Sequence, residues 1–140
     1  MPFKLNISEK GKAWKLDIEN EIFLSKNIGD KVHGKELSPE LDGYELEITG
    51  ASDIAGFPHK KDIEGQALRR VLLKRGWGMR DNTEGLRLRK TVRGKQLSDK
   101  TMQINLKVLK EGHKKLHDIF PDQNKPKEKP VQAETAPTTA

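Results

Sequence analysis

The sequence predicts a mostly β fold: a small antiparallel β-barrel-like domain with minor helical segments and a disordered C-terminal tail. Two observations lead to this prediction. Apolar and polar residues alternate with a period of two in several segments, as they do in half-buried strands. Glycine and other turn-forming residues separate these segments at short intervals, which is typical of small antiparallel barrels or sandwiches.

The expected strands follow from this alternation. Apolar residues occupy every second position from Met102 to Val108, a spacing that would scatter them around a helix, so we expect a strand there. Residues 64–74 fit the spacing of either a helix or a strand, and we favour a strand or an irregular segment. The same alternation predicts further strands at residues 3–7, 14–18, 44–48 and 86–92.

Turns and short helices are expected between the strands. Residues 8–12 have the composition of a hairpin turn. Ser38 and Pro39 predict one helical turn over residues 37–41, with Ser38 as the N-cap and Pro39 at the first helical position. A second short helix is expected around residues 113–120.

The C-terminal residues have the composition of a disordered tail. Residues 122–140 are rich in Pro, Lys, Glu and Thr and carry almost no large apolar side chain, so burial cannot repay the entropy of ordering them. We therefore expect a folded domain over residues 1–120 and a tail over residues 121–140.

Composition restricts the class of protein. In a chain of 140 residues, 33% are hydrophobic and 34% are charged. This composition predicts one domain with a small hydrophobic core, and a protein that depends on a binding partner. The absence of cysteine removes disulfides and thiolate catalysis, and favours a cytoplasmic location. No stretch approaches the ~20 apolar residues needed to span a bilayer, so no membrane partner is expected.

The basic charge is concentrated in one part of the chain. All seven arginines lie between residues 69 and 93, although lysine is found along the whole length. Residues 60–95 carry a net charge of +8, whereas residues 1–59 carry −4. Arginine grips phosphate with a planar fork of donors and stacks on bases, so this distribution predicts a nucleic-acid-binding surface.

Two segments add aromatic rings to this charge. Phe57 and Pro58 precede two lysines at an expected loop tip, which is suited to insertion into folded RNA, although Phe57 could equally pack on the core. Trp77 lies between two glycines and is free either to stack on a base or to fill a tight bend. Along the strand expected at 86–92, the odd positions point to one side and form a ladder of Arg87, Arg89 and Arg93.

No other group of residues predicts phosphate-loop, metal or catalytic chemistry. Residues 50–56 resemble a phosphate-binding loop, but five residues separate the glycines and no Gly-Lys-Ser/Thr follows. His113 and His117 are four residues apart, yet no third metal ligand accompanies them. No nucleophile or paired carboxylates suggest catalysis, so we expect no enzyme activity, no cofactor, no metal and no small-molecule substrate.

Several motifs in order resemble one known family. The segment from Gly43 to Asp53, then Gly56-Phe57-Pro58, and then Arg89-Lys90-Thr91-Val92-Arg93-Gly94 are similar to the archaeal and eukaryotic small-subunit ribosomal protein six family. The similarity begins at Phe3 and runs to about Gly112. The resemblance implies a non-catalytic structural protein seated on ribosomal RNA. After Gly112 the chain matches the shorter archaeal form and not the eukaryotic one, which continues into a long basic helix.

We therefore predict a structural constituent of the small ribosomal subunit in the cytoplasm, with small-subunit ribosomal RNA and neighbouring ribosomal proteins as its partners. A free-standing RNA- or DNA-binding regulator is the alternative, and a hydrolase with an unrecognised carboxylate pair is a more distant one. The residues expected to contact RNA are Phe57, His59, Lys60, Lys61, Arg69, Arg70, Arg75, Trp77, Arg80, Arg87, Arg89, Lys90, Arg93 and Lys95.

Overall fold

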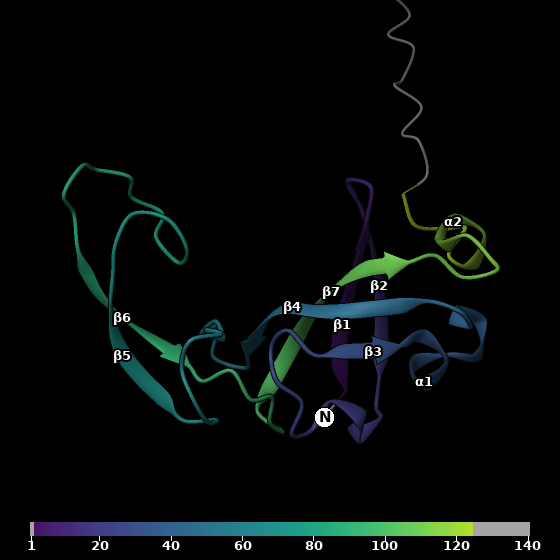
Figure 1. Cartoon of the computed structure of the whole chain (residues 1–140), viewed down its shortest axis with the longest axis horizontal. Coiled ribbons are helices and arrows are strands. Elements are labelled where there is room, and N and C mark those ends of the chain that lie inside the picture. Colours follow the sequence, from purple (N-terminus) through teal and green to yellow (C-terminus); the bar gives the residue numbers. More distant parts are fainter. Residues whose placement is uncertain (1, 125–140) are drawn as a thin grey trace, which may run out of the picture.

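The computed structural model describes residues 2–124 and contains two β-sheets. The larger one has five strands in the order β2-β1-β7-β4-β3 and forms the body of the molecule (Figure 1). In chain order its strands are β1 (Phe3–Glu9), β2 (Lys12–Ile18), β3 (Lys31–His33), β4 (Glu45–Asp53) and β7 (Thr101–Lys110).

The second sheet is a two-stranded antiparallel ribbon that projects away from the body (Figure 1). It consists of β5 (Leu68–Leu73) and β6 (Leu88–Arg93). The loop of residues 74–87 joins the two strands and curls back toward the ribbon. We refer to residues 68–93 as the arm. An isolated hairpin is marginally stable in water, so the arm depends on what holds its base.

The helical segments are all short. They are η1 (Glu21–Phe23), α1 (Gly34–Leu37), η2 (Pro39–Leu41) and α2 (Leu116–Ile119). Ser38 caps η2 as predicted, because its hydroxyl oxygen accepts a hydrogen bond from the Glu40 backbone N–H at 3.4 Å. The short helix predicted around residues 113–120 is also confirmed, as the single turn of α2.

The predicted strands are confirmed in all five segments of alternating sequence. The hairpin turn predicted over residues 8–12 is confirmed, and Lys10 and Gly11, both with positive φ, connect β1 to β2 there. The ambiguous segment 64–74 contains a strand, β5, and no helix. The three residues of β3 were not predicted, since a run that short carries no measurable period.

The predicted mostly β fold is confirmed, but the prediction of a small antiparallel β-barrel-like domain is wrong in its barrel and in its purely antiparallel pairing. Both sheets are open, and the central strand β7 pairs parallel with β1 while it pairs antiparallel with β4. The period of two identifies strands but contains no information about which strands become neighbours.

At the free edge of β2, the Gln123 side chain accepts from the Lys15 N–H at 2.6 Å and donates to the Lys15 carbonyl at 2.8 Å. This contact caps the edge locally.

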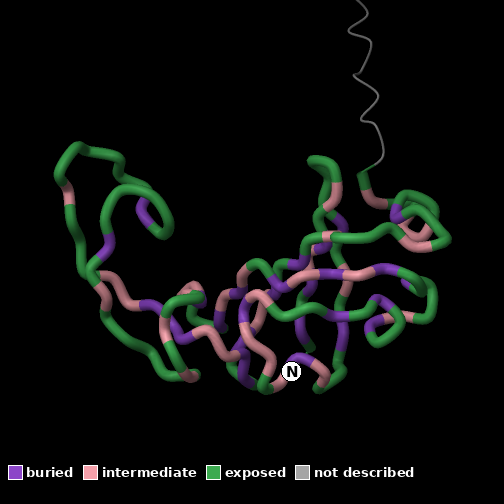
Figure 2. The backbone as a smooth tube through the Cα atoms, in the orientation of Figure 1, coloured by how far each residue is buried: buried purple, intermediate pink, exposed green. Residues whose placement is uncertain are grey.

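The main hydrophobic core lies in the body. Alternate residues of the three central strands are fully buried, and they include Leu5, Ile7, Ile48, Ile104 and Leu106. Phe23, Leu41 and Leu97 from the connecting segments cover them, also with no exposed surface. Figure 2 shows the contrast with the arm, most of which is exposed.

The predicted tail falls mainly outside the described residues. Nothing is described for residues 125–140, so disorder there stays a prediction. The predicted boundary at residue 120 also stays a prediction, although Gln123 and Asn124 still hydrogen bond with the backbone of β2.

Candidate nucleic-acid interface

Six of the seven arginines are exposed, and all six lie on the arm. They are Arg69 and Arg70 on β5, Arg75, Arg80 and Arg87 in the loop, and Arg89 on β6. Acidic residues occupy only two positions of the arm, Asp81 and Glu84. The net positive charge found in the sequence is therefore concentrated on the part of the molecule that stands away from the core.

Strand register divides the ribbon into two faces. Arg70 lies opposite Thr91 and Leu72 lies opposite Arg89, so these four side chains share one face. Leu72 is 54% exposed there, so this face is open and mixes guanidinium groups with an apolar surface. Such a surface suits RNA, because guanidinium planes bind phosphate and also stack on bases.

The other face of the ribbon is partly covered. Leu73 and Val92 point to it and are buried, at 4% and 1% exposure. Met79, from the curled loop, is also buried and lines the same groove as Leu73 and Val92. The arm thus has a small apolar centre of its own, which supports one face and leaves the other open.

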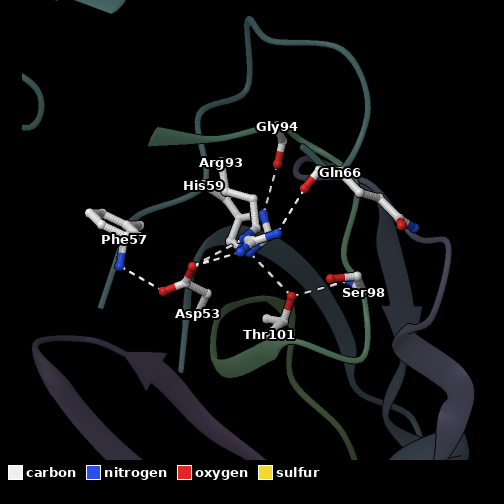
Figure 3. Close-up of polar contacts among 8 residues, drawn as sticks. All are labelled: Asp53, Phe57, His59, Gln66, Arg93, Gly94, Ser98 and Thr101. Atoms are coloured by element: carbon white, nitrogen blue, oxygen red, sulfur yellow. Dashed lines mark hydrogen bonds and ion pairs between the residues drawn. The ribbon is translucent and has the colours of Figure 1, made fainter. Parts of the chain in front are cut away.

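The structure corrects the predicted arginine ladder at Arg93. Arg87 and Arg89 are exposed, but Arg93 is only 8% exposed and forms an ion pair with Asp53 (Figure 3). Its Nε and Nη2 atoms donate to Asp53 Oδ2 at 3.1 and 2.9 Å. Its Nη1 donates to the Gln66 carbonyl oxygen at 2.9 Å. Alternation predicts the face on which a side chain lies, but not that the base of the ribbon is enclosed by residues 58–66.

Asp53 joins Arg93 to the neighbouring loop. Its second carboxylate oxygen, Oδ1, accepts a hydrogen bond from the Phe57 backbone N–H at 2.7 Å (Figure 3). Sequence reasoning missed the role of Asp53. The alternation of Leu46 and Ile48 would place Asp53 on the outward face, but a register shift between Ile48 and Gly50 turns it inward. Asp53 is therefore buried, where a charge requires a partner, and no local pattern predicted this.

His59 is also buried, which corrects its predicted place at an exposed loop tip. The side chain has 3% exposure. Its Nδ1 donates to the Gly94 carbonyl oxygen at 2.7 Å, and its Nε2 accepts from the Thr101 hydroxyl at 3.2 Å (Figure 3). Thr101 Oγ1 in turn accepts from the Ser98 backbone N–H. This arrangement suits the neutral ring, since each nitrogen has a partner of the right kind.

Backbone pairing completes the base of the arm. The Arg93 N–H donates to the Pro58 carbonyl, and the Lys60 N–H donates to the Arg93 carbonyl, both at 2.9 Å. The His59 N–H bonds to the Ala51 carbonyl in β4 at 2.9 Å. Gly94 has no room for a side chain, because a Cβ atom there would lie 2.0 Å from the Gly65 carbonyl oxygen. Residues 58–60 therefore fasten the arm to the body.

Burial lowers the pKa of His59 below its ordinary value of 6.5, and the adjacent Arg93 guanidinium acts in the same direction. The Gly94 carbonyl and the Asp53 carboxylate oppose this shift without reversing it. The folded protein therefore keeps His59 neutral at a pH where the unfolded chain would begin to protonate it.

Stability should consequently fall as the pH drops below about 6.5. As the pH falls, the unfolded chain binds a proton at His59 before the folded chain does. The free energy of unfolding therefore decreases as the pH falls from 6.5 to the lower pKa of the folded state, with a slope of at most about 1.4 kcal/mol per pH unit. Urea unfolding at pH 7.5, 6.5 and 5.5 measures this. The slope should flatten in His59→Gln and persist in His117→Gln, an exposed control. Equal slopes in all three proteins would contradict the prediction.

The remaining predicted residues lie either on the arm or beside its base. Phe57 is half-buried, whereas Lys61 and Trp77 are exposed, Trp77 at 49%. The Lys60 Nζ atom lies 4.8 Å from the centroid of the Trp77 ring and 3.6 Å from Asp62 Oδ2. A cation over an indole face is attractive, so this contact links the arm's loop to its base. Lys90 and Lys95 are half-buried, and Lys95 is paired with an exposed Glu64 at 2.8 Å.

The arm also exposes apolar residues that were not predicted as part of the site. Leu68, Leu72 and Leu88 have exposures of 44%, 54% and 39%. With Trp77 they account for most of the large exposed apolar side chains in residues 2–124. Leu88 lay in a predicted strand, where its period suggested burial, whereas Leu68 and Leu72 lay in the segment that fitted either a helix or a strand. Leu68 and Leu72 lie together on the open face of the ribbon, whereas Leu88 lies opposite Leu73 on the other face. Exposed apolar side chains grouped on one element mark a surface that a partner covers.

Within residues 2–124, no group of three or more His, Cys, Asp or Glu side chains is placed to hold a metal ion. None of the short helices in that part of the chain has the length and apolar character of a membrane span.

Comparison with known proteins identifies the family. The model of the family described as ribosomal protein S6e matches residues 3–121. A protein of Methanococcus maripaludis strain C6, named small ribosomal subunit protein eS6, is 41% identical over 114 residues, which are 80% of this chain and 90% of the relative. Proteins of the same name from Archaeoglobus fulgidus and Methanosphaera stadtmanae are 41% and 38% identical, over 86% of this chain and 96% and 93% of their own lengths. The chain belongs to the ribosomal protein S6e family.

Proposed function

We propose that this protein is a structural constituent of the small ribosomal subunit in the cytoplasm, and that its arm binds ribosomal RNA. Membership of a ribosomal protein family supports the structural, non-enzymatic role. The observation that supports RNA binding is the placement of six exposed arginines on one projecting ribbon and its loop.

The arm has the properties of an RNA-binding element. Each strand of six residues spans about 20 Å, at roughly 3.3 Å per residue, which is long enough to follow several phosphates. Guanidinium groups that neutralise these phosphates release condensed counterions, and this release supplies sequence-independent affinity. Specific seating then comes from the shape of the arm and from its aromatic and aliphatic side chains.

The body serves a different purpose. Its buried core fixes the five-stranded sheet. The Asp53–Arg93 ion pair and the hydrogen bonds of His59 to Gly94 and Thr101 fix the base of the arm against that sheet. A positioned arm loses less conformational entropy on binding than a free hairpin does. The role of Arg93 and His59 in this proposal is thus to orient the arm. Lys60, Lys61 and Lys95 border the RNA, and Arg69, Arg70, Arg75, Arg80, Arg87, Arg89 and Lys90 contact it.

The apolar residues of the arm argue for a permanent partner. Leu68, Leu72, Leu88 and Trp77 would remain in water if the protein acted alone. Stable incorporation into a particle covers them with ribosomal RNA or with neighbouring ribosomal proteins. A free-standing regulator that visits nucleic acid briefly would expose them for most of its lifetime.

Sedimentation tests the ribosomal assignment. A tagged full-length chain, expressed in an archaeal host, should co-sediment with small subunits through a sucrose gradient and stay with them after a high-salt wash. A control in which Lys12, Lys15 and Lys107 of the body are replaced with Gln should behave in the same way, because these exposed residues lie away from the arm. Recovery of the wild-type chain mainly in the ribosome-free fractions would contradict the assignment and favour the free-standing regulator.

A further inference from the structure

We infer that the groove between the arm and residues 56–58 is a binding site for one unstacked nucleotide of RNA, with the base between apolar side chains and the phosphate at the cationic rim. This inference rests on the proposed function and names the part of the RNA that the arm would recognise. It reverses the expectation that Phe57 inserts into the RNA, because the structure offers a hollow beside Phe57 into which RNA can insert.

The groove has apolar walls and a packed floor. Phe57 and Pro58 form one side, and Leu73, Met79 and Val92 form much of the rest. Leu73, Met79 and Val92 are each at most 9% exposed, so the floor is a fixed surface and not a set of loose side chains. The groove is open to solvent and has a volume of about 730 Å³. That volume falls within the range of roughly 300–1,000 Å³ found for small-molecule sites.

Glycine at two positions keeps the groove open. Gly78 has a φ of +74°, and a Cβ atom there would lie 3.1 Å from Leu73 Cδ1. Gly56 has a φ of +90°, which other residues rarely adopt. A side chain at Gly56 would strain the backbone, and one at Gly78 would also press on Leu73 in the floor. At both positions, therefore, only backbone atoms border the groove.

The rim has the charge of a phosphate site. Arg80 is exposed at the rim, and Lys90 and Thr91 line the groove beside it. The residues that line the groove, all in the described part of the chain, include no acidic side chain. An apolar side chain from a protein would leave the cations of Arg80 and Lys90 without a partner. A nucleotide satisfies both parts of the site, because it joins an apolar ring to a phosphate.

The occupant must be unstacked. Bases within a duplex present only their edges, and the deep major groove of A-form RNA is closed to side chains. Bases in loops and bulges are free to turn outward, and proteins commonly hold them between aromatic and aliphatic side chains. Phe57 supplies the aromatic wall of the groove, and Arg80 and Lys90 supply hydrogen-bond donors at its rim.

Paired RNA probes separate base recognition from charge. One probe is a six-nucleotide oligoadenylate, and the other is an abasic ribose-phosphate oligomer of the same length and charge. The full-length protein should bind the oligoadenylate about 10-fold more tightly, which corresponds to about 1.4 kcal/mol, because only the oligoadenylate has a base to stack on Phe57. Binding should also change the fluorescence of Trp77, which is adjacent to Gly78 in the groove, and Trp77→Phe should abolish that change.

Three variants test the site itself. Phe57→Ala should reduce the preference for oligoadenylate to about 2-fold or less, and Phe57→Leu, which keeps an apolar wall, should retain part of it. Leu109→Ala is the matched control, because Leu109 is an exposed apolar residue of β7 in the body, outside both the groove and the arm. It should leave the preference unchanged. Thermal unfolding of each variant confirms that it is folded before binding is compared.

The outcomes distinguish this inference from the proposed function. Equal binding of the two probes, unaffected by Phe57→Ala, would overturn the nucleotide site and leave binding by the arginines intact. Loss of ribosome incorporation in Phe57→Ala with an unchanged oligoadenylate preference would also overturn it, in favour of a protein side chain in the groove. Failure of the wild type to bind either probe at low salt would contradict RNA binding by the arm, and the nucleotide site with it.

Discussion

Replacing Arg93 with Met should lower the free energy of unfolding by about 3–5 kcal/mol. The substitution leaves the Asp53 carboxylate buried without its partner, and loss of one member of a buried ion pair costs about this much. Asp53→Asn should also be strongly destabilising, because it leaves a buried guanidinium and weakens the contact with the Phe57 N–H. Urea denaturation of the purified variants provides the measurement.

The double variant separates the pair from its surroundings. Asp53→Asn with Arg93→Met leaves neither charge buried, so it should be less destabilised than the sum of the two single variants. Lys110→Met is the matched control, because it breaks an ion pair between Lys110 and Glu45 at 3.3 Å in which the lysine is 71% exposed. That loss should be below about 1 kcal/mol.

The same variants decide between two roles for Arg93. If Arg93 were a direct phosphate ligand, Arg93→Met would weaken RNA binding while its stability stayed close to that of the wild type. We expect instead that Arg93→Met mainly lowers the free energy of unfolding. Any loss of RNA affinity should be an indirect result of the loosened base of the arm.

The sequence was most informative where the physical signal is local. Strand positions follow from side chains that alternate every two residues, and the Ser38-Pro39 cap follows from hydrogen-bonding chemistry within a few residues. These features appear in the structure at the expected positions. The concentration of arginine in residues 69–93 also marked the arm, because a charge distribution is a property of composition.

What the sequence could not supply was the arrangement of distant segments. The parallel pairing of β1 with β7 joins residues about a hundred positions apart, and no local pattern specifies it. The burial of Arg93 likewise depends on Asp53, forty residues earlier, and on the enclosing segment that contains Gln66. A cation that neutralises a buried acid and a cation that binds phosphate have the same appearance in a sequence, and only their surroundings distinguish them.

Replacing Arg70, Arg87 and Arg89 together with Gln should weaken binding to small-subunit ribosomal RNA roughly 100-fold at 0.1 M salt and leave the fold intact. All three are exposed on the arm, so little native packing is lost. Each phosphate contact contributes about 0.7–0.9 to the slope of log affinity against log salt concentration, so removal of three should flatten that slope by about 2–3.

Filter binding over a series of salt concentrations measures both quantities. The control replaces the body residues Lys12, Lys15 and Lys107 with Gln, which removes the same formal charge from surfaces outside the arm. If the interface is the arm, the control keeps the wild-type slope and only the arm variant flattens it. If both triple variants flatten the slope equally, affinity depends on net charge and not on the arm. If neither does, the RNA contacts lie elsewhere. Position, and not the amount of charge, is what the proposed interface requires.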